Sequence, residues 1–187
     1  ICLLLGYPAA YIMAMADFKT PQVMAMLFIL PMWINFLLRT IATVELFRMF
    51  GLPLGEGALL FGMVYDFLPF MIYPIYNTLQ KMDTSLIEAA HDLGAKRSQV
   101  FMKVTLPLSV PGIYSGIVMV FMPTVSTFAI AELLTHNKVT LFGSLIQRCF
   151  GEGGIAMWNY GAALSLIMLI IIGLTSFFGG DKEDINR

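Results

Sequence analysis

An all-α membrane protein is the fold class that this sequence predicts, and three observations predict it. Of its 187 residues, 58% are hydrophobic and only 12% are charged, whereas a soluble domain carries ~25% charged residues. The mean hydropathy is +0.81. The charged residues are clustered, so that long apolar stretches lie between the clusters. Most of the surface must therefore face lipid, and a net charge of −1 gives no indication of nucleic-acid binding.

Four segments are long and apolar enough to cross a bilayer, which takes ~20 mainly apolar residues in a helix. They comprise residues 23–43, 57–79, 108–134 and 160–178. Because lipid cannot satisfy irregular backbone, each segment is expected to form one helix. The prolines inside these segments are expected to cause kinks rather than breaks, because neighbouring helices can satisfy the freed carbonyls. These prolines are Pro31, Pro69, Pro74 and Pro123.

The opening run, residues 1–16, is too short to span a bilayer comfortably and lacks the basic flank of a signal peptide. We interpret it as the end of a helix whose beginning is missing, which makes about five helices in total.

Lysine and arginine predict the orientation of these helices. If the five segments cross alternately, one set of connections carries more basic residues than the other, and the positive-inside rule places that set in the cytoplasm. The C-terminal tail, residues 179–187, then lies in the cytoplasm as well. The richer set holds Lys19, Lys81, Lys96, Arg97, Lys103, Lys182 and Arg187. The poorer set holds Arg48, Lys138 and Arg148, with Arg39 near its membrane face.

The longest polar stretch, residues 81–107, is predicted to fold as a helix-turn-helix knuckle on the cytoplasmic side. Asp83 or Ser85 can cap its first helix, and Gly94 suits the left-handed turn that ends a helix. The second helix is expected to stop before Pro107, since the residue before a proline is disfavoured in a helix. Apolar residues recur at helical spacing in both: Leu86, Ala89, Ala90 and Leu93, then Val100, Phe101 and Val104.

The knuckle resembles the EAA signature of type I ABC importer permeases: Glu88-Ala89-Ala90, then Gly94, then Leu106-Pro107 before the next span. The resemblance implies that family's transmembrane fold, with its first helix missing, as a single domain over residues 1–187. It also implies that the knuckle, residues 81–107, is the coupling helix that docks in a cleft of a cytoplasmic ATPase. A solvated loop between two helices is the alternative. The implied docking residues are Glu88, Ala89, Ala90, Asp92, Gly94, Leu106 and Pro107.

The resemblance extends along the chain and is greatest to the permease branch for spermidine and putrescine. Residues 31–33, 39–40, 66–74, 88–95, 106–112 and 120–123 carry it. The connection around residues 46–56 is shorter than in most of that branch. This branch implies that the cargo is a polyamine. Importers of ferric iron, thiosulfate or molybdate share the EAA signature, so a related solute stays the alternative.

An enzyme is not indicated, because the chain has no phosphate-binding glycine-rich loop and no nucleophile–base pair or metal-ligand spacing. We therefore expect no metal and no cofactor, with ATP bound by a separate subunit. The resemblance implies four kinds of partner in a bacterial inner membrane. They are a dimeric ATP-binding cassette ATPase, a second permease, an extracytoplasmic substrate-binding protein and membrane lipid. A membrane scaffold or an intramembrane enzyme is the alternative class.

Asp66 is a candidate for the substrate path, since a carboxylate inside a span costs ~2.5–3.5 kcal/mol and should face the bundle or a water-filled cavity. It can contact an ammonium group, or it can be a structural partner of Arg39. Glu132, at the outer end of its helix, can guide cations or simply be solvated.

Aromatic and hydroxyl side chains give the other candidates for this path. Tyr65 and Tyr73 belong to an aromatic run that offers cation–π contacts, although such residues also serve as packing or interface anchors. Thr127 belongs to a polar stretch after Pro123, which suits either a bending pore lining or hydrogen bonds between helices.

Overall fold

Two long antiparallel helices, α4 (Glu56–Gln80) and α7 (Leu106–Ser126), form the centre of the bundle. The computed structural model describes residues 1–15, 21–136, 138–151 and 155–180, and the regular elements of that part are all helical, as predicted. Three helical stretches are long and apolar enough to cross a membrane: Glu56–Gln80, Arg97–Ser126 and Met157–Ser176. The last of these lies in α10 (Ile155–Gly180), and the shorter apolar helix α1 (Cys2–Met15) packs on α4.

The prediction of one helix over residues 23–43 is wrong. The chain forms α2 (Pro21–Ile29), a 3₁₀ turn (Leu30–Trp33) and then α3 (Phe36–Met49), and the two halves are bent by 97°. Ile34 is extended, and the side chain of Asn35 accepts a hydrogen bond from the Leu37 amide at 2.8 Å. Because this N-cap satisfies an amide that the first helix would otherwise have paired, α3 begins as a new helix in a new direction.

The prediction of one helix over residues 108–134 is also wrong. α7 ends at Ser126, Thr127 is extended, and the short helix α8 (Ala129–Thr135) follows. Pro123 has no amide proton to donate to the preceding turn. Its helical acceptor, the carbonyl four residues earlier, therefore loses that bond, which weakens the last turns of α7. The hydroxyls of Thr124 and Ser126 donate to other carbonyls of these turns, those of Val120 and Met122, at 2.6 and 3.1 Å. A further helix, α9 (Phe142–Gly151), was not predicted.

The knuckle contains α5 (Thr84–Asp92) and α6 (Arg97–Val100), followed by a π-helical turn (Phe101–Thr105) that runs directly into α7. The prediction that its second helix stops before Pro107 is therefore wrong. In the π turn, Leu106 donates its amide to the carbonyl of Phe101, five residues earlier. Because Pro107 then lies in the first turn of α7, where a proline is tolerated, the helix can continue through it.

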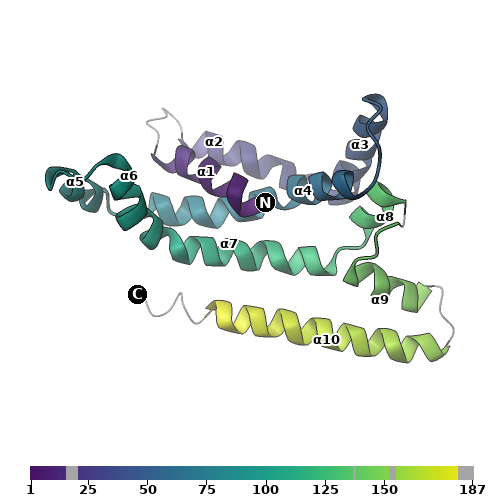
Figure 1. The fold of residues 1–187 in the computed structure, drawn as a ribbon. Coiled ribbons are helices and arrows are strands. Elements are labelled where there is room, and N and C mark those ends of the chain that lie inside the picture. Colours follow the sequence, from purple (N-terminus) through teal and green to yellow (C-terminus); the bar gives the residue numbers. More distant parts are fainter. Residues whose placement is uncertain (16–20, 137, 152–154, 181–187) are drawn as a thin grey trace.

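The helices alternate in direction, which is the arrangement that the assignment of the cytoplasmic side from the basic residues assumes; the side itself stays a prediction. Figure 1 shows the carboxyl ends of α1 and α10 on the same side as α5 and α6, whereas α3, α8 and α9 lie at the opposite end. We call these the inner and the outer end. Lys19, Lys182 and Arg187 lie outside the described residues. The alternation is therefore seen from the directions of the helices and not from the positions of these three basic residues.

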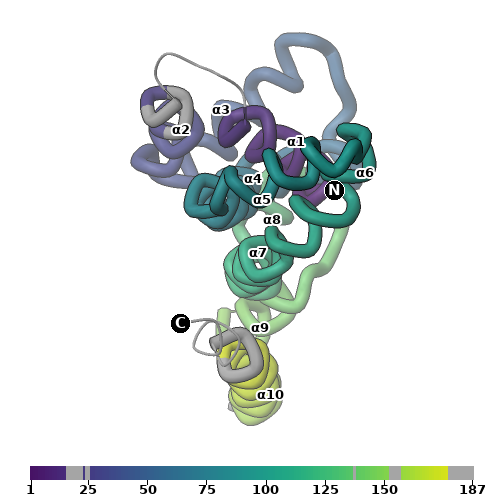
Figure 2. Tube along the Cα trace, turned by 90° about the vertical axis from the view of Figure 1, so that its left-hand side faces the viewer, coloured from purple at the N-terminus to yellow at the C-terminus, as the bar shows by residue number. Residues whose placement is uncertain are grey.

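α4 is the central helix of the bundle, because the two buried apolar clusters found among the described residues both contain residues of α4. The inner cluster joins α1 to the inner half of α4. The outer cluster joins α3 and α8 to the outer half. α7 approaches α4 closely, since a Cβ added at Gly112 would lie 2.9 Å from the carbonyl oxygen of Pro74. Figure 2 shows α10 at the edge of the bundle, on the far side of α7 from α4.

Candidate functional site

A cavity of about 650 Å³ lies at the outer end, between the two helix breaks. Ile34 and Asn35 of the first break and Thr127 and Phe128 of the second break line it together. The sequence segments are about 90 residues apart, and packing of α3 and α8 on the outer half of α4 brings them to one place. A discontinuous helix leaves backbone groups that its own turns do not pair, and such groups are tolerated at membrane depth where they face a cavity.

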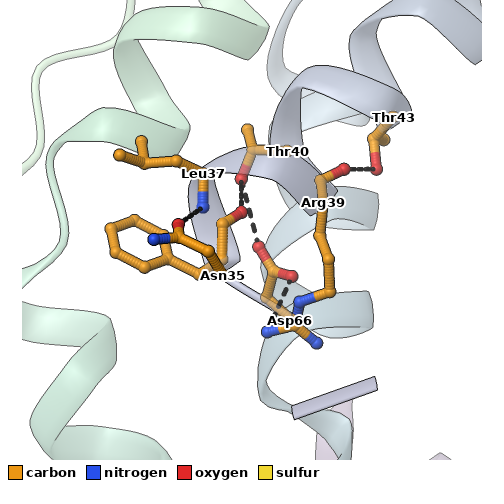
Figure 3. Close-up of polar contacts among 7 residues, drawn as sticks. Asn35, Leu37, Arg39, Thr40, Thr43 and Asp66 are labelled. Atoms are coloured by element: carbon orange, nitrogen blue, oxygen red, sulfur yellow. Dashed lines mark hydrogen bonds and ion pairs between the residues drawn. The ribbon is translucent and has the colours of Figure 1, made fainter. Parts of the chain in front are cut away.

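An ion pair between Arg39 and Asp66 forms part of the cavity wall (Figure 3). Nη2 of Arg39 lies 3.2 Å from Oδ1 of Asp66, and the hydroxyl of Thr40 donates to Oδ2 at 3.3 Å. The two charged residues are 7% and 1% exposed. Arg39 was the structural partner expected for Asp66, and that pairing is confirmed. The pair attaches the bent helix α3 to α4.

The guanidinium of Arg39 is only partly satisfied. Its Nε and Nη1 are buried and have no hydrogen-bond partner among the described residues, while its carbon lies 5.7 Å from the ring centroid of Tyr65. A buried ion pair needs its remaining donors filled if the attraction is to exceed the cost of desolvation. The unfilled donors therefore offset part of the attraction between the two charges.

The predicted path residues separate into two groups. Asp66 and Thr127 line the cavity, and Tyr65 reaches it only through its contact with Arg39. Tyr73 instead borders a small separate void beside Tyr76, and Glu132 is exposed on α8 outside the cavity lining. A substrate contact by any of them stays a prediction.

Aromatic rings dominate the cavity wall. Phe67 and Phe70 belong to the aromatic run of α4 that the sequence already offered for cation–π contacts, whereas sequence reasoning assigned no site role to the rings at the two breaks: Trp33, Phe36 and Phe128. The signal that points to them is the pair of interrupted apolar segments, which marks the binding site in many transporters. Ring faces attract organic cations, and the carboxyl end of α7, which carries the negative end of the helix dipole, also reaches this cavity through Ser126.

At the inner end, the predicted caps of α5 are confirmed. The carboxylate of Asp83, rather than Ser85, is the N-cap and accepts the Ser85 amide at 2.9 Å. Hydrogen bonds from Ser85 lower the pKa of Asp83. Gly94 has a φ of +80°, and the amides of Gly94 and Ala95 donate to the carbonyls of His91 and Ala90 at 2.8 and 3.1 Å. These two bonds form a Schellman motif, which ends the helix in a fixed direction.

α5 has no buried residue, so its surface is available to another protein. Of the predicted docking residues, Glu88, Ala89, Asp92 and Gly94 are exposed and Ala90 is half-buried. Leu106 and Pro107 instead begin α7. One further residue belongs to the exposed surface: Leu93, at the end of α5, is 90% exposed. Leu93 thus adds one large apolar side chain to the exposed surface of the knuckle.

The family follows from these features and from sequence comparison. Residues 6–180 match the family of binding-protein-dependent transport system inner membrane components, and the chain belongs to that family. It is therefore a multi-pass protein of the bacterial inner membrane and a non-catalytic component of a transport system.

Individual relatives agree with this membership. The chain is 35% identical over 190 residues to the spermidine/putrescine transport system permease protein PotB of Escherichia coli, covering 92% of this chain and 68% of that protein. It is 36% identical over 194 residues to the PotB protein of Haemophilus influenzae, covering 95% of this chain and 67% of that one. It thus spans about two thirds of the length of these relatives, whose names agree with the polyamine branch that the sequence predicted.

A solved structure confirms the fold class. The chain superimposes on one from inward-facing conformations of the MetNI methionine ABC transporter with a TM-score of 0.70, covering 95% of this chain and 84% of that chain. The two sequences are only 19% identical, so this likeness establishes the type I importer fold and gives no information on the cargo.

Proposed function

We propose that this chain is a permease subunit of an ATP-driven importer that carries polyamines such as spermidine and putrescine. The observation that carries the proposal is the knuckle, residues 81–107, whose capped helix α5 lies at the inner end and has no buried residue. The chain acts as a single domain, residues 1–187. Its knuckle binds a separate ATPase and is displaced when that ATPase changes conformation. Its relatives named as spermidine/putrescine permeases support the choice of cargo.

The docking surface combines a charged patch with an apolar tip. Glu88 and Asp92 are four residues apart, which places them on the same face of α5, and both are exposed. Ala89 and Gly94 keep the surface small enough for close approach. Leu93 supplies the apolar contact that charges alone do not provide, because hot spots at interfaces are usually side chains that become fully desolvated. The ATPase dimer would bind this surface and hold the ATP, so the chain itself needs no cofactor.

The outer cavity suits the cargo in a specific way. Its five rings offer faces for ammonium groups and apolar surface for the methylene segments between them. Asp66, the one carboxylate in its wall, is already neutralised by Arg39. Charge attraction to a polyamine would therefore come from groups beyond the wall, such as the exposed Glu132. A binding protein would deliver the cargo at this end, and a second permease would complete the path.

Transport by the complete importer, reconstituted in vesicles with its ATPase and binding protein, tests the cargo. Spermidine or putrescine should accumulate when ATP is supplied and should stimulate ATP hydrolysis. Accumulation of thiosulfate, molybdate or ferric iron, with no uptake of polyamines, would instead establish the related-solute alternative.

Substitution at the knuckle tests the coupling role. Glu88→Ala should lower substrate-stimulated ATP hydrolysis roughly tenfold, the equivalent of ~1.4 kcal/mol of docking energy, while membrane insertion is unchanged. Glu45→Ala is a matched control, because Glu45 is an exposed glutamate at the outer end, paired with Arg48. Stimulated hydrolysis that is equally high in Glu88→Ala and Glu45→Ala would reject this residue as a docking contact.

A further inference from the structure

Three aromatic rings join the first helix to the knuckle. Phe101, the first residue of the π turn, lies against Tyr7 and Tyr11 of α1. Its ring centroid is 6.0 Å from that of Tyr7 and 5.3 Å from that of Tyr11, and both contacts are edge-to-face at 77° and 87°. The two tyrosine rings stack on each other at 6.5 Å. We call Tyr7, Tyr11 and Phe101 the aromatic clasp.

The clasp also holds the chain beyond the π turn. The hydroxyls of Tyr7 and Ser109 are 3.0 Å apart, and Ser109 donates its own proton to the carbonyl of Leu106 at 2.8 Å. Because the Ser109 hydroxyl has a single proton, Tyr7 must be the donor to Ser109. Ser109 is fully buried, whereas Tyr7 is half-buried. α1 therefore contacts both the beginning of the π turn, at Phe101, and the start of α7.

A π turn at this place is a weak point in an otherwise continuous helix. Its hydrogen bonds span five residues instead of four, and such turns are frequent at functional positions. Residues 97–126 form one continuous helical stretch from α6 through α7, with the π turn inside it. With the weak point between them, a force on α5 and α6 can bend this stretch instead of moving α7 as a whole. Through the aromatic clasp, a displacement of α5 and α6 can also act on α1.

α1 is in turn packed tightly on α4. Ala10 and Met13 of α1 belong to the same buried cluster as Met71 and Ile75 of α4. The approach is closest at Gly6, next to Tyr7 in the chain, where an added Cβ would lie 2.8 Å from Cγ of Met71. Five residues before Met71, α4 carries Asp66, the carboxylate that holds α3 at the outer cavity. The backbone of α4 thus links the contacts of the knuckle with α1 to the ion pair at that cavity.

We propose that the aromatic clasp makes α1 move with the knuckle, and that Tyr7, Tyr11 and Phe101 are positioning residues for transport. In each cycle the ATPase would displace the knuckle, α1 would follow through the clasp, and α4 would carry the displacement to the ion pair at the outer cavity. This inference rests on the proposed function, since it needs an ATPase docked on α5. Spatial continuity alone does not demonstrate coupling, so the test must measure the coupling itself.

The ratio of solute taken up to ATP hydrolysed, in the reconstituted complete importer, is that measurement. Phe101→Ala should lower this ratio roughly five- to tenfold, in the range that mutations between coupled sites produce. The ATPase should still co-purify and keep its basal rate of hydrolysis. Tyr11→Leu, which keeps the bulk and removes the aromatic edge contact, should lower the ratio as well. Phe101→Tyr should restore it. A native ratio in both Phe101→Ala and Tyr11→Leu would overturn the proposal.

Phe61→Ala is the matched control. It also removes one ring from an aromatic pair, Phe47 and Phe61 at 5.5 Å, but this pair lies at the outer end. The ratio should be unchanged. An equal loss in Phe61→Ala and Phe101→Ala would show that any lost ring pair impairs the bundle, which would overturn a specific role for the clasp.

A cross-link can show whether transport needs only the attachment of α1 to the knuckle or needs the packing of the three rings themselves. The double variant Tyr11→Cys/Phe101→Cys, in a background of Cys2→Ser and Cys149→Ala, lacks two rings of the clasp and should have a low ratio. Joining the two cysteines with a short thiol cross-linker should raise the ratio again, because the attachment is restored without the rings. A cross-link that lowers the ratio further would show that the contact must open during transport and would overturn the proposal. An unmutated importer that takes up no polyamine would instead reject the proposed cargo, since the ratio can be measured with any solute carried.

Discussion

The helices α4 and α10 are nearly equal in length and apolar character, yet they lie in opposite surroundings. Their most apolar windows have mean hydropathies of 1.6 and 1.8, but 56% of the first window and only 6% of the second is buried within the protein. The exceptions in the sequence account for the difference. α4 carries Asp66 and the prolines Pro69 and Pro74, whereas residues 157–176 of α10 include no charged residue.

This difference shows that the mean hydropathy of a helix and its few charged or small residues indicate two different properties. Mean hydropathy indicates that a segment can cross the bilayer. A charge or a close-packed small residue indicates that one face of the helix meets protein, because lipid cannot satisfy such a charge and small residues let helices approach. α4 is therefore the central helix of the bundle, and α10 is a peripheral helix (Figure 2).

The largest expected effect comes from removing the charge in α4. Asp66→Ala leaves the buried guanidinium of Arg39 unpaired, which should cost about 3–5 kcal/mol and lower the thermal inactivation temperature of the assembled importer. Leu169→Ala in α10 is the matched control, because Leu169 is 69% exposed. Its effect should stay within about 0.5 kcal/mol. Equal losses of stability in the two variants would contradict the difference between the buried α4 and the peripheral α10.

The double variant Arg39→Met/Asp66→Leu distinguishes the two interpretations of Asp66. It replaces the ion pair with apolar side chains of similar volume, so most of the lost stability should return. If Asp66 is only a structural partner, uptake returns as well. A stable double variant with a raised substrate concentration for half-maximal uptake would show that the carboxylate contacts the cargo.

The next effect comes from glycines. Gly112→Ala should destabilise the importer by about 1–3 kcal/mol, since the new Cβ would lie 2.5 Å from Oγ1 of Thr78 and 2.9 Å from the carbonyl oxygen of Pro74 on α4. Gly173→Ala makes the same change in α10, where nothing lies within 4 Å of the new atom. The second variant should lose no stability in the same thermal assay. A loss there as large as that of Gly112→Ala would mean that an unseen partner packs on α10.

The smallest effect is expected just beyond the inner end of α4, where Asp83 caps α5. Its hydrogen bonds with Ser85 lower the pKa of Asp83, so the cap stabilises α5 above the ordinary aspartate pKa of ~3.9 and is lost as the pH falls below it. Amide exchange in residues 85–92 should speed up severalfold between pH 6 and 3, relative to an Asp83→Asn chain, whose cap does not titrate. Identical pH profiles for the two chains would contradict the titration of this cap.

Local patterns account for the parts of the fold that could be predicted. The knuckle is an example, because Asp83 at its start and Gly94 at its end act on their own neighbours in the chain. The pairing of Arg39 with Asp66 was also open to prediction, although the residues are far apart in sequence. A charge inside the membrane must find a partner, and few other charges are available there.

The helix breaks and the cavity between them could not be predicted in this way. Pro31 and Pro123 have the same local chemistry as Pro69 and Pro74, which lie inside the unbroken α4. Whether a proline is followed by a break depends on what the next residues can pack against. α9 escaped prediction for a related reason, since its 10 residues are too few to span a membrane.

The sequence by itself determined that the chain crosses a membrane and where a capped helix lies, and it predicts which end faces the cytoplasm. Hydropathy, basic residues and caps act locally, so they can be read from a single chain. Only the tertiary structure decided that α4 is central and α10 peripheral, that rings from three segments meet at one cavity, and that α1 holds the knuckle through Tyr7, Tyr11 and Phe101. These arrangements depend on contacts between distant segments, and the segments have no preference for one another until the bundle has packed.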